Sequence, residues 1–171
     1  MTRVNRRDAL LGLGAAGMLI AGPRPVRAAD QKPPADPLAG TWTYRSFLNN
    51  PDPKVPFNDL EFAVAQLTIR SDAGFGVLAG RLSFGADGLA LKGTVTYGNP
   101  FTVRFQGTGD SDGTKGWVYD YLGFVAPAWP NGTDPRPAIV GTIVRTVAHS
   151  DGTAKAGFVA SFIAVKQNDP K

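Results

Sequence analysis

Cysteine is absent from this 171-residue chain, and histidine occurs once, as His149. Without cysteine the protein has no disulfide, no thiolate nucleophile, no iron–sulfur cluster and no covalently attached haem of the c type. A zinc site lacks its usual ligands too, because such sites are built mainly from His and Cys. Any metal would need oxygen ligands, and we predict neither a metal site nor a cofactor.

Long apolar runs and helical periodicity are missing as well. No stretch after residue 28 has the roughly 20 consecutive apolar residues that a membrane-spanning helix needs. No segment of about ten residues in that part repeats its apolar positions with the 3.6-residue period of a helix. We therefore predict a mature chain of the all-β class without a membrane span.

The first 28 residues resemble a bacterial export signal of the twin-arginine type. Arg6 and Arg7 precede an apolar run over residues 9–22, which is rich in Gly and Ala and too short to cross a bilayer. Residues 26–28 form a small-x-small site at which a signal peptidase would cut. A general secretory signal is the alternative interpretation. Either signal implies that the protein acts in the periplasm or outside the cell.

The positive charge of the full chain belongs to this leader. It holds five of the 18 Lys and Arg residues but only one of the 14 acidic residues, so the remaining chain carries 13 of each. A neutral chain lacks the basic surface with which proteins bind the phosphate backbone of nucleic acids. We therefore expect no nucleic-acid partner.

The part after the leader predicts one β domain. Residues 29–39 hold three prolines and form a predicted flexible lead-in, and residues 40–171 alternate apolar segments with short turns rich in Gly, Asn and Asp. The eight predicted strands cover residues 40–48, 60–70, 75–84, 89–97, 101–108, 116–125, 138–148 and 156–166. Short links join antiparallel neighbours, so we predict an up-and-down antiparallel barrel, which leaves no open edge. A β-sandwich is the alternative architecture.

Apolar positions alternate along most of these strands. Leu89 and Leu91, for example, fall on the same face of one strand. In neighbouring strands, polar residues alternate with the apolar ones. In residues 60–70 the phase of the alternation changes. A β-bulge inserts one extra residue and shifts the phase in this way, and we place it near Ala65 and Gln66.

The last two predicted strands, residues 138–148 and 156–166, are apolar on both faces. An outer face is apolar when something covers it, and the cover is either a loop, a second layer or a second copy of the protein. A homodimer through these strands is therefore one of the interpretations that the pattern supports.

Gly40-Thr41-Trp42 opens the first predicted strand. A Gly-x-Trp at this place resembles the start of a calycin barrel, the group that contains lipocalins and streptavidin-like proteins. The resemblance implies that Trp42 closes one end of the barrel and that a basic residue of a late strand, Arg145 or Lys166, packs across it. A biotin site does not follow, since the last strand has neither tryptophan nor an acidic residue, and function depends on the site rather than on the fold.

Aromatic residues and one long loop supply the candidate ligand-binding residues. Tyr119 and Tyr121 share one face of a strand with Trp117, and we predict that this face lines the interior. On the outside, the same residues would form an aromatic girdle. The loop between the sixth and seventh strands holds four prolines, Trp129 and Arg136. These two side chains would form a lid with a cation for an anionic ligand end, or Trp129 would plug the barrel.

A catalytic role is the alternative for the polar residues of the same region. His149 ends the seventh predicted strand, and Asp120 or Asp151 would pair with it in a general-base arrangement. Tyr119 would supply a further polar group. A rim histidine that bonds only to the turn beside it is the simpler interpretation, since no nucleophile is evident.

Three hypotheses about function share the barrel. The first is an exported protein that binds a small, largely apolar molecule in or at the mouth of the barrel. Its predicted contact residues are Trp42, Tyr119, Tyr121, Trp129 and Arg136. The second is a cofactor-free cyclase or isomerase that uses Tyr119, Asp120 and His149. The third is a structural or partner-binding module with a filled interior.

Overall fold

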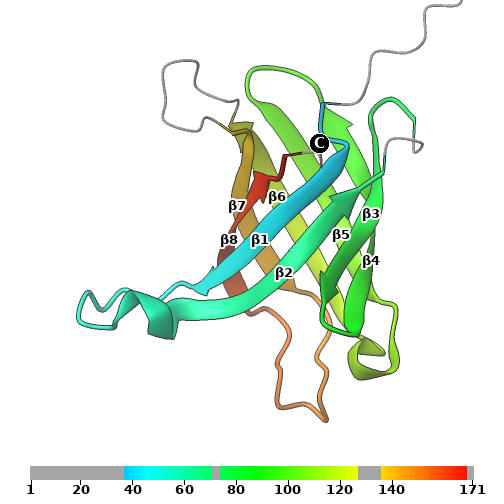
Figure 1. Ribbon diagram of the computed structural model, residues 1–171. Coiled ribbons are helices and arrows are strands. Elements are labelled where there is room, and N and C mark those ends of the chain that lie inside the picture. Colours follow the sequence, from blue (N-terminus) through cyan, green and yellow to red (C-terminus); the bar gives the residue numbers. More distant parts are fainter. Residues whose placement is uncertain (1–36, 71–73, 127–135, 169–171) are drawn as a thin grey trace, which may run out of the picture. The chain divides into compact units, whose positions relative to one another are not determined.

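The computed structural model describes residues 37–70, 74–126 and 136–168. Its strands form one closed antiparallel barrel, in which each strand pairs with the next and the last returns to pair with the first (Figure 1). The strands are β1 (Gly40–Leu48), β2 (Glu61–Ile69), β3 (Val77–Phe84), β4 (Asp87–Thr96), β5 (Phe101–Gly109), β6 (Val118–Ala126), β7 (Ala138–Arg145) and β8 (Val159–Lys166). The predicted eight-stranded up-and-down barrel is confirmed, and the alternative of a sandwich is wrong.

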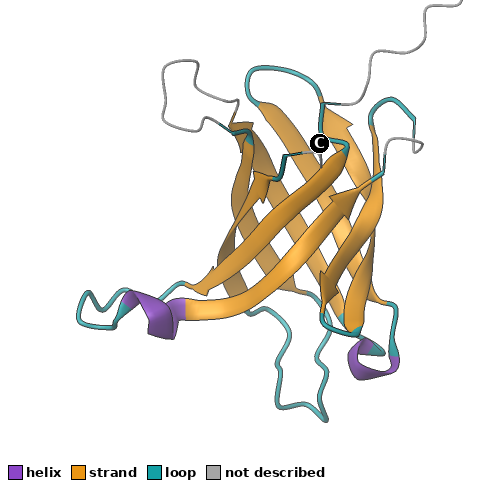
Figure 2. Cartoon of the chain, viewed as in Figure 1, coloured by secondary structure: helices purple, strands orange, loops and turns teal. Residues whose placement is uncertain are grey.

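Helical structure in the described residues is confined to two short 3-10 turns, η1 (Phe57–Leu60) and η2 (Asp112–Thr114) (Figure 2). Neither turn has the length and apolar character of a membrane-spanning helix. The tightest link joins β3 to β4 through Gly85 and Ala86, where Gly85 takes a φ of +68°. Glycine adopts that left-handed conformation without steric cost, which allows the two-residue turn.

The alternation of apolar residues decides which side chains enter the barrel. Leu89 and Leu91 of β4 and Val103 and Phe105 of β5 face the interior and are buried, whereas Lys92 faces solvent. Successive residues of a strand point to opposite faces of the sheet. An eight-stranded barrel has an interior just wide enough for such side chains, so the inward faces form the core.

The β-bulge in β2 lies nearer the start of the strand than the sequence suggests. Glu61 and Ala63 face consecutive residues of β1, so Phe62 is the extra residue. Pairing after Ala63 is regular, and the bulge predicted near Ala65 and Gln66 is wrong. The bulge turns Phe62 against the core. An even-numbered residue therefore packs inward at the start of β2, whereas odd-numbered residues face inward in the rest of the strand, and this changes the phase of the pattern.

Aromatic rings fill the middle of the barrel. Tyr44 stacks on Phe162 with 5.6 Å between ring centroids, and Phe105 stacks on Tyr121 at 4.5 Å. Tyr121 also meets Phe162 edge-on at 5.8 Å. All four rings are buried, and each such pair contributes about 0.5–1.5 kcal/mol beyond the burial of its area. This cluster separates the two ends of the barrel into distinct compartments.

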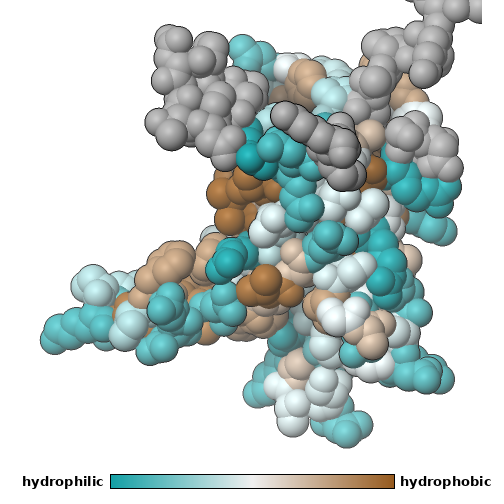
Figure 3. All heavy atoms as spheres, viewed as in Figure 1, coloured by the Kyte–Doolittle hydropathy of each residue, from teal (hydrophilic) through white to brown (hydrophobic). Residues whose placement is uncertain are grey.

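The outer face of β7 and β8 is apolar, as the sequence pattern indicates. Val140 of β7 and Val159 of β8 are 40% and 42% exposed. Phe124 of β6, which is 45% exposed, pairs with Val140 and extends the surface. Figure 3 shows hydrophobic residues gathered over β7 and β8. A homodimer through this face stays a prediction, which the mass of the protein in solution would test.

Candidate functional site

The end of the barrel that carries Trp42 is closed by its own residues. The Trp42 ring is fully buried, and its Nε1 donates a hydrogen bond to the Leu38 carbonyl at 3.0 Å. Lys166 Nζ lies 5.7 Å from the centre of the same ring and donates to the Pro37 carbonyl at 2.9 Å. Lys166 rather than Arg145 therefore occupies the position that the calycin resemblance implies.

Gly40 makes this closure possible. Its φ of +126° lies in the region that favours glycine, and a Cβ at this position would stand 3.3 Å from Lys166 Cε. Leu38, at the end of the predicted lead-in, is buried in the core. The Gly-x-Trp motif thus has a structural reason, because the glycine leaves room for Lys166 to reach Trp42.

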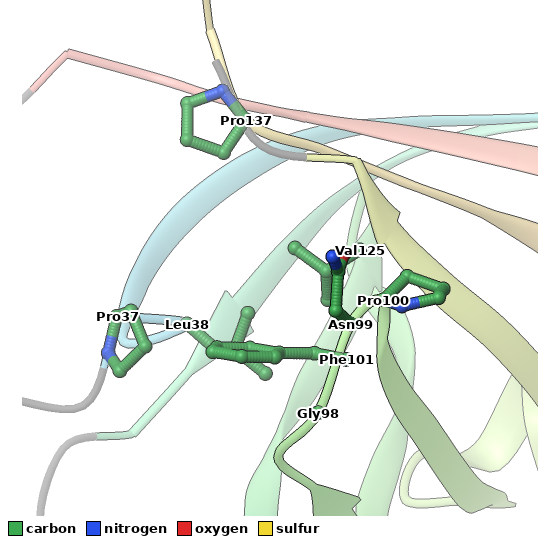
Figure 4. A pocket seen from close by; sticks show the side chains of 8 residues that line it. All are labelled: Pro37, Leu38, Gly98, Asn99, Pro100, Phe101, Val125 and Pro137. Atoms are coloured by element: carbon green, nitrogen blue, oxygen red, sulfur yellow. The ribbon is translucent and has the colours of Figure 1, made fainter.

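A cavity of about 250 Å³ lies at this closed end (Figure 4). In Figure 4 the ring of Phe101 points toward Leu38. The lining residues are Pro37, Leu38, Gly98, Asn99, Pro100, Phe101, Val125 and Pro137. None of them is ionisable, so this cavity offers an apolar shape but no charge and no acid–base group to act on a ligand.

A larger cavity of about 350 Å³, here called the mouth cavity, opens at the opposite end, which is the lower end of the barrel in Figure 1. Its wall combines apolar and aromatic side chains with hydroxyls, one guanidinium and one imidazole. The lining residues are Tyr44, Ser46, Phe62, Ala63, Val64, Leu82, Phe84, Leu89, Trp117, Tyr119, Tyr121, Ile143, Arg145, His149 and Ser150. An apolar wall with a few convergent polar groups is typical of small-molecule sites.

A chain of hydrogen bonds crosses the rim of the mouth cavity. Arg145 Nε donates to the Tyr119 hydroxyl at 3.1 Å, and that hydroxyl lies 2.8 Å from His149 Nε2. His149 Nδ1 lies 2.9 Å from the Ser150 hydroxyl. Since the Tyr119 oxygen accepts from Arg145, its own proton is directed to Nε2, and this network assigns the imidazole proton to Nδ1. Tyr119 is therefore placed to exchange a proton with His149.

The loop between β7 and β8 positions His149. The imidazole stacks on Trp117 with 4.2 Å between ring centroids. Ser150 and Asp151 follow with φ values of +52° and +54°, and the Gly152 N–H donates to the His149 carbonyl at 3.2 Å. These two residues therefore form the centre of a tight turn that begins at His149. Burial and the nearby charge of Arg145 lower the pKa of His149. The imidazole is therefore neutral at pH 7.

Arg145 lies in the wall of the mouth cavity and is 9% exposed. Besides its bond to Tyr119, its Nη1 donates to the Lys155 carbonyl at 3.2 Å. The guanidinium carbon lies 5.0 Å from the ring centre of Phe158, 5.6 Å from that of Tyr119 and 6.0 Å from that of Phe62. Ring faces stabilise a cation at such distances, so the aromatic wall holds the guanidinium in place.

Two further hydroxyls lie deeper in the mouth cavity. Tyr44 is buried, and its hydroxyl has no hydrogen-bond partner among the described residues. Burial raises the pKa of Tyr44 to about 12; the Ser46 and Tyr121 hydroxyls partly oppose this increase, but neither makes a hydrogen bond of good geometry with it. Burial also raises the pKa of Tyr121 well above its usual value. Both groups are neutral at pH 7, and the Tyr44 hydroxyl is a buried polar group without a hydrogen-bond partner among the described residues.

The structure brings together two of the five predicted ligand contacts. Tyr119 and Tyr121 line the mouth cavity, and the prediction that they face inward is confirmed. Trp42 closes the other end, and Arg136 lies two residues before the start of β7, at that same closed end. Trp129 lies outside the described residues.

Two of the three predicted catalytic candidates also meet. Tyr119 and His149 form a hydrogen bond in the mouth cavity. Asp120 is exposed on the outer face of the barrel, where its Oδ1 accepts a hydrogen bond from Gln106 Nε2 at 2.9 Å. Neighbouring residues of a strand point to opposite faces, so Asp120 and Tyr119 do not share a cavity.

Sequence reasoning did not assign Arg145 and Tyr44 to a ligand site. Tyr44 lies on the inward face of β1 with Trp42, and Arg145 lies on the inward face of β7 with Ile143. The signal was present in the period-two pattern, because a charged or hydroxylated residue at an inward position of an otherwise apolar face marks a candidate site.

Comparisons with known proteins give no family for this chain. No protein-family model matches the sequence, and no curated protein matches it at a significant level. The fold is a closed eight-stranded barrel, consistent with a calycin-like architecture. What the protein does must therefore be inferred from the mouth cavity.

Proposed function

We propose that this protein binds a small, largely apolar molecule in the mouth cavity. The observation that carries the proposal is the cavity itself, whose volume of about 350 Å³ falls in the range of about 300–1,000 Å³ that is typical of small-molecule sites. The aromatic cluster in the middle of the barrel gives it a solid floor. A ligand would therefore enter from the open end and stop half-way down the barrel.

The wall of the cavity supports this choice of ligand. Leu82, Leu89 and Ile143 supply apolar surface, and Trp117 and Phe84 stack at 6.2 Å to form an aromatic edge at the rim. Apolar area removed from water contributes about 25 cal/mol per Å², so these side chains would provide most of the binding energy. The hydroxyls among them would orient the ligand.

An uncharged fluorescent probe tests the proposal. N-phenylnaphthylamine should bind the wild-type protein with an increase in fluorescence. Ala63→Phe, which places a ring in the cavity from β2, should abolish that increase. The matched control is Ala126→Phe, at the exposed last residue of β6, at the closed end of the barrel. This variant should bind like the wild type. Equal binding by wild type and Ala63→Phe would contradict the proposal.

Acid–base catalysis without a cofactor is a second candidate, favoured by the contact between Tyr119 and His149. A proton can move between these groups, and Arg145 Nε donates a hydrogen bond to the same Tyr119 oxygen. If wild type converts a bound compound that Tyr119→Phe binds but returns unchanged, the protein is an enzyme. Recovery of the same unchanged compound from both proteins would favour binding alone.

We also propose that the protein acts in the periplasm or outside the cell, after export by the twin-arginine-type signal of residues 1–28. These residues lie outside the part of the chain that the structure describes. The support for export is the sequence pattern. Sequencing of the mature N-terminus tests it, and a protein that retains residues 1–28 would contradict it.

A further inference from the structure

The wall of the mouth cavity holds a buried cation without an anion beside it. Among the described residues no carboxylate forms an ion pair with Arg145; the ion pairs there are Arg45 with Glu61 and Arg81 with Asp110. The acceptors of Arg145 are two neutral oxygens, a tyrosine hydroxyl and a backbone carbonyl. A guanidinium has five N–H groups, so the others remain for a further acceptor.

The two buried hydroxyls and the imidazole of the cavity do not neutralise this charge. Tyr44 and Tyr121 keep their protons at pH 7, and the His149 imidazole is neutral. No Asp or Glu is among the lining residues. The mouth cavity therefore carries one positive charge within a mostly apolar wall.

An unpaired buried charge is costly, because it loses the hydration that it has in water. The aromatic faces around Arg145 offset part of that cost, but none of them carries a negative charge. A bound anion would restore the balance and would gain from the low dielectric of the cavity. Arg145 lines the cavity at 9% exposure, so a ligand in the cavity would meet it.

We propose that the molecule bound in the mouth cavity is a monocarboxylate with an apolar body, and that its carboxylate pairs with Arg145. This inference rests on the proposed function and adds the charge of the ligand to it. Carboxylate and guanidinium are both planar and match through two parallel hydrogen bonds. The Tyr119 hydroxyl accepts from Nε and the Lys155 carbonyl accepts from Nη1, which fixes the plane of the guanidinium. The second N–H of Nη1 and both N–H groups of Nη2 remain for the carboxylate. A single positive charge favours a monoanion over a dianion.

The apolar body would then lie in the remaining part of the cavity. Leu82, Leu89 and Ile143 form the wall beyond the charged rim. The site thus selects a ligand that is charged at the rim and apolar below it.

A matched pair of compounds tests this inference, first on the wild-type protein and then on two variants. Naphthoate and naphthamide share the same apolar rings and differ in charge, and calorimetry at pH 7 gives the affinity of each. The wild-type protein should bind naphthoate about tenfold or more tightly, as expected for a charge-assisted pair. Arg145→Met should bind the two compounds equally. Arg104→Met, which removes an exposed cation from the outer face of β5, should keep the full preference.

The possible outcomes separate this inference from the proposed function. Equal affinities in the wild type would overturn the carboxylate proposal, while binding of naphthamide would uphold the cavity as a binding site. Binding of neither compound would contradict both. A preference that survives in Arg145→Met would assign the anion to another cation. If Arg145→Met does not fold, Arg145→Lys keeps the charge but loses the planar donor pair, and should reduce the preference several-fold.

Discussion

The two ends of the barrel use the same chemical pair, a cation beside an aromatic ring, for different purposes. At the closed end Lys166 lies 5.7 Å from the centre of the Trp42 ring. At the open end Arg145 lies 5.0 Å from that of Phe158 and 5.6 Å from that of Tyr119. The distances are similar, so the pair itself does not decide the role. What decides it is whether the chain covers the pair.

At the closed end, the residues just before β1 cover the pair of Lys166 and Trp42. Pro37 and Leu38 accept hydrogen bonds from Lys166 and Trp42, so both polar groups are satisfied within the protein. At the open end Arg145 faces a cavity, and the loop between β7 and β8 contributes His149 to its rim instead of sealing it. The closed end thus stabilises the fold, and the open end offers donors that a ligand can use.

The largest expected effect comes from removing the tryptophan of the closed end. Trp42→Ala deletes a fully buried ring and its hydrogen bond to Leu38, so the free energy of unfolding should fall by about 3–5 kcal/mol. Trp117→Ala, at the rim of the open end, removes a half-buried ring and should cost about 1–2 kcal/mol. Urea denaturation measures both values.

Binding should show the opposite order at these two positions. Trp117 lines the mouth cavity, so Trp117→Ala should weaken the binding of N-phenylnaphthylamine several-fold. Trp42→Phe, which keeps an aromatic ring at the closed end, should leave that binding unchanged. A greater loss of stability from Trp117→Ala than from Trp42→Ala would contradict the division between a stabilising and a binding end.

Two buried hydroxyls give the next contrast. Thr114 Oγ1 donates to the Gly88 carbonyl at 2.8 Å, whereas the Tyr44 hydroxyl in the mouth cavity has no partner among the described residues. Thr114→Val should therefore lower the free energy of unfolding by about 1–3 kcal/mol. Tyr44→Phe should leave the free energy of unfolding unchanged or raise it by about 1 kcal/mol, because the substitution removes a hydroxyl that is buried without a hydrogen bond. Denaturation of both variants beside the wild type measures the difference.

A destabilised Tyr44→Phe would be the informative failure. It would mean that the hydroxyl does bond inside the protein, for example to a buried water.

The strands could be predicted from the sequence because their signals are local. Alternation put Leu89 and Leu91 on one face of their strand and Tyr119 and Tyr121 on one face of theirs, and in the structure both faces point inward. Turn residues such as Gly85 fixed the hairpins. Short links between most of the successive strands then favour an up-and-down sheet, and closure removes its open edges.

The site was harder to predict because it depends on register and on which loops share an end. Tyr119 and Arg145 are Cα partners across β6 and β7, and such a pairing is set by strand lengths rather than by either residue. Loops of an up-and-down barrel alternate between its ends, so Arg136, before β7, cannot join His149, after β7. That rule follows from the order of the strands in the sequence. It places Arg136 and His149 at opposite ends of the barrel, so one pocket cannot hold both.

The smallest expected effect is a pH dependence that belongs to His149. It is the one histidine of the chain, and histidine is the side chain whose ordinary pKa lies between about pH 5 and 8. Burial and the charge of Arg145 hold the pKa of His149 in the folded protein below its ordinary value of 6.5. In the unfolded chain the ordinary value returns, so the unfolded state takes up the proton at a higher pH than the folded state does.

The sign of the effect follows from that difference. The contribution of His149 to the free energy of unfolding is complete above its unfolded pKa and is lost as the pH falls through the folded pKa. His149→Gln keeps a polar side chain beside Tyr119 but does not titrate. Relative to this variant, the wild type should lose stability as the pH falls through the ordinary pKa of 6.5 and on through the lower pKa of the folded state, as urea denaturation at each pH would measure. Trp42→Phe, at the closed end, should follow the wild-type slope. If wild type and His149→Gln had the same slope, the charge of Arg145 would not reach the imidazole, and the open end would lose the electrostatic coupling that distinguishes it from the closed end.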